Sequence, residues 1–407
     1  MALQPVPEPG MPSAVVRGLA ERYLVHARTC PPLRADVPLL YGLALLHSDR
    51  LDPDLLAALW NVDPAEVADI FTGLAARHDF VLRGSRRLHD DVRDAIRLHL
   101  LDDALRVAQR PMNERAAAHL SRRLRLLRLA GAEAQLADQE WHSGATALLW
   151  NTFWAGNRAG MGLLADLLPA AGVLAESFGM TLLDVARFFL PVLNEQDKRT
   201  VVAFSDLARL SLRQPRDADR ADTSHDAQTA FALQVLDEHR DRGGSVLATD
   251  IPRAVYLSLL KVKYARCTGG RAERALPALE HAAAALPAAQ PGATSRAIGQ
   301  VAEGLADDLI FVARWQVRAT REGLRAAELA TQHNPGSSTA WWLLAVARGQ
   351  LGPDQPRQPA DLVRPARRGS PGVRYRDPRW PWLRSRAAYQ GMGAAAPGPF
   401  PGRPGRR

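Results

Sequence analysis

The stretch from Glu322 to Gly349, EGLRAAELATQHNPGSSTAWWLLAVARG, decides the fold class. The residues before Asn334-Pro335 are mostly strong helix formers, and the proline ends that helix because it lacks an N–H and clashes with the preceding turn. Ser337-Ser338 can cap a second helix, in which apolar residues follow at helical spacing. The stretch therefore predicts two helices joined by a short turn.

This helix pair resembles a tetratricopeptide repeat, in which a proline closes one unit and an aromatic residue follows six positions later. A leucine and a small residue then come three and four positions after the aromatic. The matching residues are Pro335, Trp341, Leu344 and Ala345, with Gly323 and Ala330 at earlier small-residue positions. Residues 249–267 and 271–286 form a weaker second copy. The resemblance implies tetratricopeptide-like helical repeats over residues 229–350.

The composition supports an all-α fold for the rest of the chain. Of 407 residues 47% are apolar, and Ala, Leu and Arg, which favour helices, are abundant. The two cysteines, Cys30 and Cys267, form no disulfide framework, which suits a reducing cytoplasm. The N-terminus lacks the layout of a signal peptide, and no apolar run reaches the ~18–20 residues of a membrane span. We therefore expect a cytoplasmic protein with no membrane span.

The excess of positive over negative charge lies in the C-terminal tail. Residues 351–407 contain 12 Arg, 3 Asp and no Lys or Glu, which accounts for the whole net charge of +9. The tail also holds 11 of the 29 prolines and much glycine, so it cannot bury enough apolar surface to offset the entropy of ordering. We expect it to be disordered, and the basic charge says nothing about residues 1–350.

Residues 36–103 have the element order of a winged-helix domain. An apolar helix at 38–47 is followed by two helix starts, Asp52-Pro53 and Asp63-Pro64, where aspartate caps and proline occupies the first helical position. Two short apolar segments around a turn at residues 83–86 then predict a β-hairpin, and a further helix starts near Asp90. Around this domain we expect a partly disordered N-terminal segment (1–35), a helical block (104–213) and a polar linker (214–228).

The hairpin ends in Leu88-His89-Asp90, at the start of a helix. Together with the order of the elements, this triplet resembles the winged-helix and repeat arm of STAND-type signalling ATPases, where a Met-His-Asp triplet closes the winged helix. In that family the histidine approaches the β-phosphate of bound ADP. The resemblance implies a nucleotide-facing position for His89 and Asp90, but the P-loop expected before them is not in the sequence. A separate nucleotide-binding chain is therefore a possible partner.

No catalytic or metal-binding constellation is evident in the sequence. The GxxxxGK[ST], HExxH, paired CxxC and GxSxG patterns do not occur, so we expect no enzyme activity, no cofactor and no metal. His26 and Cys30 lie one helical turn apart but have no second pair to complete a site. The large aromatics Trp141, Trp150, Phe153 and Trp154 could line a groove, although helical spacing favours a place in the core.

The sequence thus predicts a non-catalytic scaffold or sensor that binds a protein or peptide through its helical repeats. A first alternative is a DNA-binding regulator, whose contacts would be Arg83, Arg86 and Arg87 in the hairpin. DNA binding is the less favoured reading because the presumed recognition helix has a mixed rather than a basic face. A second alternative is one piece of a split ATP-dependent switch.

Overall fold

The computed structural model describes residues 14–47, 52–82, 87–211, 223–238, 247, 251–267, 272–286, 292–312 and 317–351. These residues are helical apart from short connections and one two-stranded hairpin, so the all-α prediction is confirmed. They belong to one compact unit, residues 1–357. The tail predicted to be disordered lies outside the described residues, except for Leu351.

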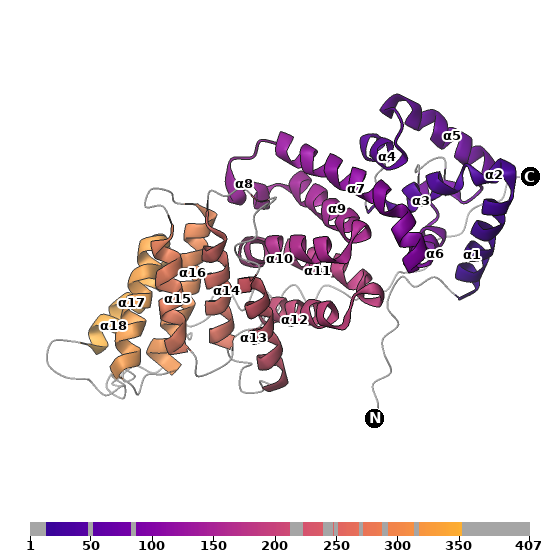
Figure 1. Cartoon of the computed structure of the whole chain (residues 1–407). Helices are drawn as coiled ribbons and strands as arrows, with labels where there is room; N and C mark the ends of the chain where they lie inside the picture. Colours follow the sequence, from indigo (N-terminus) through magenta and orange to yellow (C-terminus); the bar gives the residue numbers. More distant parts are fainter. Residues whose placement is uncertain are drawn as a thin grey trace, which may run out of the picture. The chain divides into compact units, whose positions relative to one another are not determined.

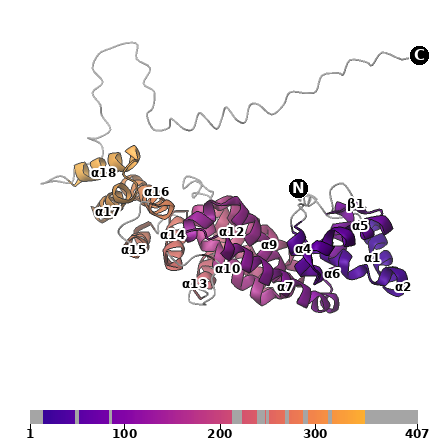
Figure 2. The same cartoon turned by 90° about the horizontal axis from the view of Figure 1, so that it is seen from above.

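The N-terminal block consists of helices, seen in Figure 1, and one short hairpin, which Figure 2 shows beside α5. Its elements are α1 (Ala14–Thr29), α2 (Pro31–Arg34), α3 (Val37–Leu45), α4 (Pro53–Trp60), the 3-10 turn η1 (Pro64–Glu66), α5 (Val67–Arg77), β1 (Val81–Leu82), β2 (Arg87–Leu88) and α6 (Asp90–Leu100). The strands are antiparallel, with Val81 opposite Leu88. The order of helices and hairpin between residues 37 and 100 is the one that the sequence predicts.

Local capping explains where several of these helices begin. The carboxylate of Asp52 accepts a hydrogen bond from the backbone N–H of Leu55 at 3.1 Å. Asp63 accepts one from Ala65 at 2.8 Å. Each bond satisfies an N–H that the first turn of a helix leaves without a partner. These two caps were recognisable in the sequence because they depend on neighbouring residues alone.

Helix α1 lies within residues 1–35, the segment expected to be partly disordered. It packs against α3 and α6. Leu24 and Ala27 are each only 1% exposed. Burying this apolar face offsets the entropy lost when the segment is ordered.

The middle block is wholly helical where it is described. It consists of α7 (Asp103–Leu126), α8 (Gly131–Ala137), α9 (Gln139–Ala155), α10 (Asn157–Leu174), α11 (Glu176–Phe188), the 3-10 turn η2 (Leu190–Val192) and α12 (Glu195–Ser211). Helix α7 packs along α9. The aromatic side chains Trp141, Trp150, Phe153 and Trp154 are at most 3% exposed. They belong to the core, as their spacing favoured, and line no surface groove.

The third block forms two layers of helices. Its elements are α13 (Thr223–Glu238), α14 (Arg253–Cys267), α15 (Ala272–Ala284), α16 (Ala293–Asp307), the π-helical turn η4 (Asp308–Val312), α17 (Val317–His333) and α18 (Ser338–Gln350). From α14 onward each helix contacts the next helix and the one after it. One layer therefore contains α14, α16 and α18, and the other contains α15 and α17 (Figure 2).

Two expected boundaries differ from the structure. Helix α13 begins at Thr223, inside the stretch 214–228 expected to be a linker, and residues 214–222 lie outside the described part. Thr, Ser and Asp at the start of α13 are residues that favour helix N-termini. In addition, one hydrophobic core runs from Leu24 to Tyr264, across the expected boundary at residue 103. A second core runs from Val255 to Ala347, and α14 contributes to both.

Candidate functional site

The first candidate site is the corner between the hairpin and α6. The backbone N–H of His89 donates to the carbonyl of Phe80 at 2.8 Å, which fixes the end of the hairpin, and Leu88 is 1% exposed. Helix α6 begins at the next residue, Asp90. The side chains of His89 and Asp90 are 56% and 52% exposed. The structure therefore brings both predicted residues together at a helix start that faces solvent.

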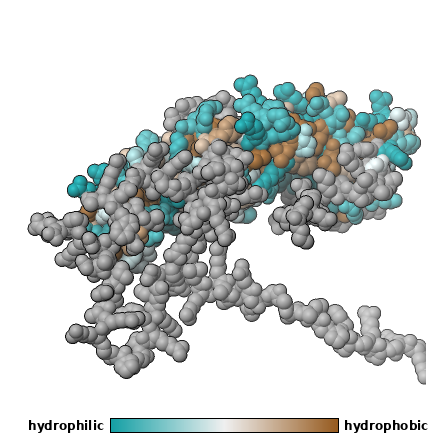
Figure 3. Space-filling view, turned by 90° about the horizontal axis from the view of Figure 1, so that it is seen from below, coloured by the Kyte–Doolittle hydropathy of each residue, from teal (hydrophilic) through white to brown (hydrophobic). Residues whose placement is uncertain are grey.

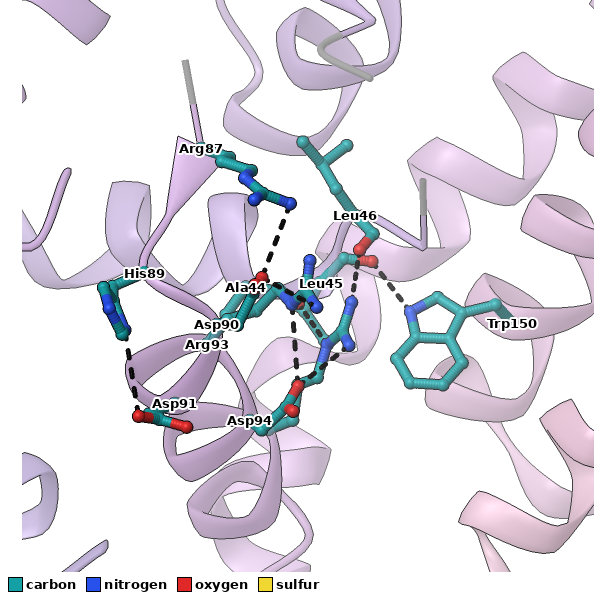
Figure 4. A network of polar contacts seen from close by, with 11 residues as sticks. Ala44, Leu45, Leu46, Arg87, His89, Asp90, Asp91, Arg93, Asp94 and Trp150 are labelled. Carbon is teal, nitrogen blue, oxygen red and sulfur yellow. Dashed lines mark hydrogen bonds and ion pairs between the residues drawn. The ribbon is translucent and has the colours of Figure 1, made fainter. Parts of the chain in front are cut away.

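Carboxylates and arginines alternate along this corner (Figure 4). Asp90 lies 3.5 Å from Arg87 and 3.2 Å from Arg93. Asp94 continues the series, 3.5 Å from Arg93 and 3.2 Å from Arg97. Because each of these guanidinium groups has a carboxylate beside it, an anionic ligand would have to compete with those ion pairs.

The acidic side of α6 is more open. The Nδ1 atom of His89 lies 4.0 Å from a carboxylate oxygen of Asp91, and both side chains are more than half exposed. Figure 4 shows these two residues on one side of α6 and Trp150 on the other. A ligand at His89 would meet an acidic helix start, which is unfavourable for a bare phosphate.

The inner side of the corner joins the first and middle blocks. The guanidinium of Arg97 donates to the carbonyls of Ala44 at 2.7 Å and Leu46 at 2.5 Å. The indole N–H of Trp150 donates to the carbonyl of Leu45 at 2.8 Å, and the Arg97 guanidinium lies 4.9 Å from the ring centre of Trp150. These carbonyls end α3, where no further turn supplies N–H donors. No local sequence pattern marks Arg97, because the carbonyls that it binds are 51 and 53 residues away.

The predicted DNA contacts are only partly described. Arg83 and Arg86 lie outside the described residues. Arg87 is in β2, about one-third exposed and beside Asp90. The part of the hairpin that is described thus presents one cation next to an acidic helix start, which does not add support for phosphate contacts.

The second candidate site is the end of the helical array, where the repeat-like residues lie. A Cβ atom at Gly323 would come within 2.8 Å of the Ile310 side chain and 3.2 Å of the Leu309 Cβ. Ala330 is fully buried. Gly323 therefore lies where helices approach closely, and Ala330 lies in the core. Ser337 caps α18 by accepting from the N–H of Ala340 at 3.2 Å.

Of the three repeat-like residues on α18, only Leu344 is buried. Leu344 is 5% exposed, whereas Trp341 is 53% exposed and Ala345 is also exposed. The residues turned toward the array are Ala340, Leu343, Leu344 and Ala347. They follow the i, i+3, i+4, i+7 spacing of one continuous apolar face of a helix, and this face determines how α18 packs. The indole N–H of Trp341 donates to the carbonyl of Pro335 at 2.9 Å.

Two further aromatic residues at this end were missed. Trp342 is 53% exposed and stacks on Phe311, with ring centres 5.5 Å apart and planes 12° apart. The adjacent Trp341 is exposed as well, and the other exposed large apolar side chains in the described part lie far away in sequence: Val25, Val107, Leu126 and Val202. Figure 3 shows one face of the molecule, on which brown apolar areas are interrupted by teal polar ones. The Phe311–Trp342 pair stands out because two rings gather at one point.

No family model, no curated protein and no solved structure matched the chain. Among the described residues no group of three His, Cys, Asp or Glu side chains could hold a metal ion. None of the described helices combines the length and hydrophobicity that crossing a membrane requires.

Proposed function

We propose that this chain is a non-catalytic, cytoplasmic scaffold or sensor arm that binds a protein or peptide through its helical repeats. The observation that carries the proposal is the two-layer stacking of α14 to α18, in which each helix contacts the next and the next but one. Stacked helix pairs of this kind present an extended surface built from one layer. The tetratricopeptide-like spacing around Pro335 supports the same function.

The layer of α14, α16 and α18 is the favoured binding surface. Helix α16 exposes Arg296, Gln300 and Asp307 along one side, and the neighbouring α18 exposes two tryptophans. Aromatic and arginine side chains are enriched where proteins bind one another. Helix α17, in the other layer, exposes Arg321, Arg325, Glu328 and Gln332 and no aromatic residue.

A matched pair of variants tests this proposal. Gln300→Arg and Gln332→Arg make the same change at exposed positions of the two layers. In affinity capture from native lysate with quantitative mass spectrometry, we expect Gln300→Arg to lose the partner recovered by the wild-type chain and Gln332→Arg to retain it. Recovery of no partner above background, or equal loss in both variants, contradicts the proposal.

We further propose that residues 36–103 are a winged-helix domain related to the arm of STAND-type ATPases. The position of His89 and Asp90 directly after the hairpin supports this relationship. Because His89 is 56% exposed, His89→Ala should change the free energy of unfolding of the isolated chain by less than about 0.5 kcal/mol. The same change should weaken a complex with a nucleotide-binding partner chain, measured by calorimetric titration with ADP present. A complex of unchanged affinity removes His89 from this role.

A further inference from the structure

The end of α7 is rich in arginine and lacks acidic residues. Residues 115–132 contain five arginines and no aspartate or glutamate. One of these arginines, Arg115, donates to the last carbonyls of α4. Another, Arg123, pairs with Asp52 and lies 3.0 Å from Glu140. These two arginines therefore serve contacts between neighbouring helices.

The other three arginines are exposed. Arg122 and Arg125 are three residues apart, and Leu126 follows Arg122 by four residues, so the three side chains share one face of α7. Leu126 is 73% exposed, and Arg128 follows directly after the helix. Among the described residues no carboxylate pairs with Arg122, Arg125 or Arg128. We call Arg122, Arg125, Leu126 and Arg128 the basic surface of α7.

Few acids lie beside this surface. The preceding acid on α7, Glu114, lies eight residues before Arg122 and pairs with Arg110 at 2.8 Å. Helix α4 adds one exposed carboxylate, Asp54. Residues 48–51, which precede α4 outside the described part, contain one aspartate and one arginine, so they add no net charge. The three exposed arginines therefore outnumber the acids that could neutralise them.

Local helix preferences do not account for these arginines. The helix dipole favours a cation within the last turn, but Arg122 lies before that turn. Arg128 has a φ of 48°, the left-handed conformation in which a helix is most often followed by glycine. An arginine at position 128 is thus present against the preference of the backbone. A ligand for the guanidinium groups explains both positions.

We propose that the basic surface of α7 binds an acidic peptide segment of a partner protein that also carries an apolar side chain. The guanidinium groups of Arg122 and Arg125 can each donate two parallel hydrogen bonds to a carboxylate of the segment. Leu126, on the same face, can contact the apolar side chain. This surface lies outside the array of α14 to α18, so the inference goes beyond the proposed function and does not depend on it.

Other occupants fit this surface less well. Single-stranded nucleic acid binds by stacking its bases on aromatic side chains, whereas the exposed apolar side chain here is aliphatic. Duplex DNA requires several phosphate contacts, and a membrane requires more buried apolar area than one leucine supplies. The tail of this chain carries 12 Arg and only 3 Asp, so the basic surface repels it.

Fluorescence anisotropy of the full chain with a fluorescein-labelled peptide of glutamates around a central leucine tests the proposal. We expect saturable binding that weakens with added salt. Arg122→Gln/Arg125→Gln should weaken binding about ten-fold. The matched control, Arg321→Gln/Arg325→Gln, removes two exposed arginines from α17 and should leave affinity within two-fold. Both double variants lower the net charge of +9 equally, so the comparison separates a local site from general attraction to the polypeptide.

The leucine contact has a test of its own. Leu126→Asn should weaken binding of the same peptide about four-fold, because an apolar contact is lost. It should leave unchanged the binding of a peptide in which asparagine replaces the central leucine. Val107→Asn is the control, because Val107 is 71% exposed near the other end of α7, and it should leave affinity unchanged for both peptides.

The alternative results each overturn the proposal. These results are the absence of saturable binding, equal losses in the α7 and α17 double variants, and unchanged affinity in Leu126→Asn. Duplex DNA or phosphatidylserine vesicles that bind more tightly than the peptide, with the same loss in Arg122→Gln/Arg125→Gln, would assign the surface to that ligand instead. A dimer that this double variant dissociates, measured by light scattering, would assign it to a second copy of the chain.

Two further readouts keep the interpretation clear. Circular dichroism and thermal unfolding should match the wild type in every variant, because each substituted side chain is exposed. The Gln300→Arg capture experiment concerns α16 and involves no residue of the basic surface. If that capture succeeds while the acidic peptide does not bind, this inference fails and the proposed function stands.

Discussion

Asp36 is buried, only 4% exposed, directly before α3. The contacts that start at its carboxylate connect α3 with the end of α5 and with α1. Arg77 donates to both carboxylate oxygens of Asp36 at 2.7 Å, and the His78 ring nitrogen Nε2 lies 2.8 Å from one of them. The Tyr23 hydroxyl lies 2.6 Å from the other ring nitrogen of His78. Tyr23 is on α1, so this chain of contacts helps to hold that helix in place.

This network predicts an acid-sensitive contribution to stability. Burial raises the pKa of Asp36, but the hydrogen bonds from Arg77 and His78 outweigh burial and hold the pKa below its usual value. A lowered pKa stabilises the fold above the unfolded-state value of about 4, and this stabilisation is lost as pH falls through the folded-state value. Asp36→Asn should therefore lower the free energy of unfolding by about 1–3 kcal/mol at pH 7 and by less at pH 3.

Urea unfolding followed by circular dichroism between pH 3 and pH 7 measures this difference. The control is Asp91→Asn, which alters a 59% exposed carboxylate and should cost less than about 0.5 kcal/mol at any pH. A difference between Asp36→Asn and the wild type that stays constant with pH would show that the ionised carboxylate is not the stabilising species.

Replacing glycine by alanine should have opposite effects on stability at two helical positions. A Cβ atom at Gly299 in α16 would lie 2.9 Å from the backbone N of Asn334 and 3.1 Å from the backbone C of His333, whereas one at Gly162 in α10 meets nothing within 4 Å. Gly162→Ala should stabilise the fold by about 0.5–1 kcal/mol, because alanine favours the helix. Gly299→Ala should destabilise it by about 1–3 kcal/mol through overpacking. Urea midpoints of the two variants give the comparison, and a shift of the same sign in both would contradict it.

At the scale of elements, arginines from one helix satisfy the last carbonyls of another. Arg97 does so for α3, Arg115 donates to Ala58 and Leu59 at the end of α4, and Arg106 donates to Phe153 at the end of α9. A guanidinium group offers five donors in a fixed geometry, which suits a cluster of parallel carbonyls. These bonds connect helices that are neighbours in space and distant in sequence.

Removing one of these arginine–carbonyl connections should lower the free energy of unfolding far more than removing a surface ion pair. Arg97→Met keeps an apolar stem but leaves the carbonyls of Ala44 and Leu46 without that donor, so we expect a loss of about 2–4 kcal/mol. Arg110→Met is the control, because Arg110 is 63% exposed and pairs with Glu114 four residues away. It should cost less than about 0.5 kcal/mol. Unfolding in guanidinium chloride measures the free energy of unfolding of both variants. Equal losses in the two variants would refute the role of Arg97.

The difference between local and long-range contacts explains how much of the fold and of the candidate site the sequence could predict. The caps at Asp52, Asp63 and Ser337, and the hairpin after α5, depend on residues within a few positions, so local patterns were sufficient. The packing of α1 and the partners of Arg97 depend on long-range contacts that no local pattern encodes. The Phe311–Trp342 stack joins residues 31 positions apart, although the spacing of Glu303, Asp307 and Phe311 could have suggested a common face.

At the scale of the whole compact unit, a carboxylate links the middle block to the array. Glu133 in α8 accepts hydrogen bonds from the backbone N–H groups of Ala293 and Thr294, and the bond to Thr294 is 2.6 Å long. These are the first N–H groups of α16, and a negative charge there is favoured by the helix dipole as well. The N-terminus of α16 is therefore held by a side chain from outside the array.

Glu133→Ala should therefore loosen the start of α16 without unfolding the unit. Loss of a cap costs about 1 kcal/mol, which corresponds to roughly five-fold faster hydrogen exchange for the backbone amides of residues 293–296. Exchange elsewhere in α16 should change little, because Ile298, Val301 and Leu305 are buried in the second hydrophobic core. Hydrogen exchange with mass spectrometry measures both regions, and Glu140→Ala, which alters a 58% exposed side chain, is the control. Faster exchange throughout α14 to α18 would mean instead that the array depends on the middle block to fold, since a local cap alone could not produce it.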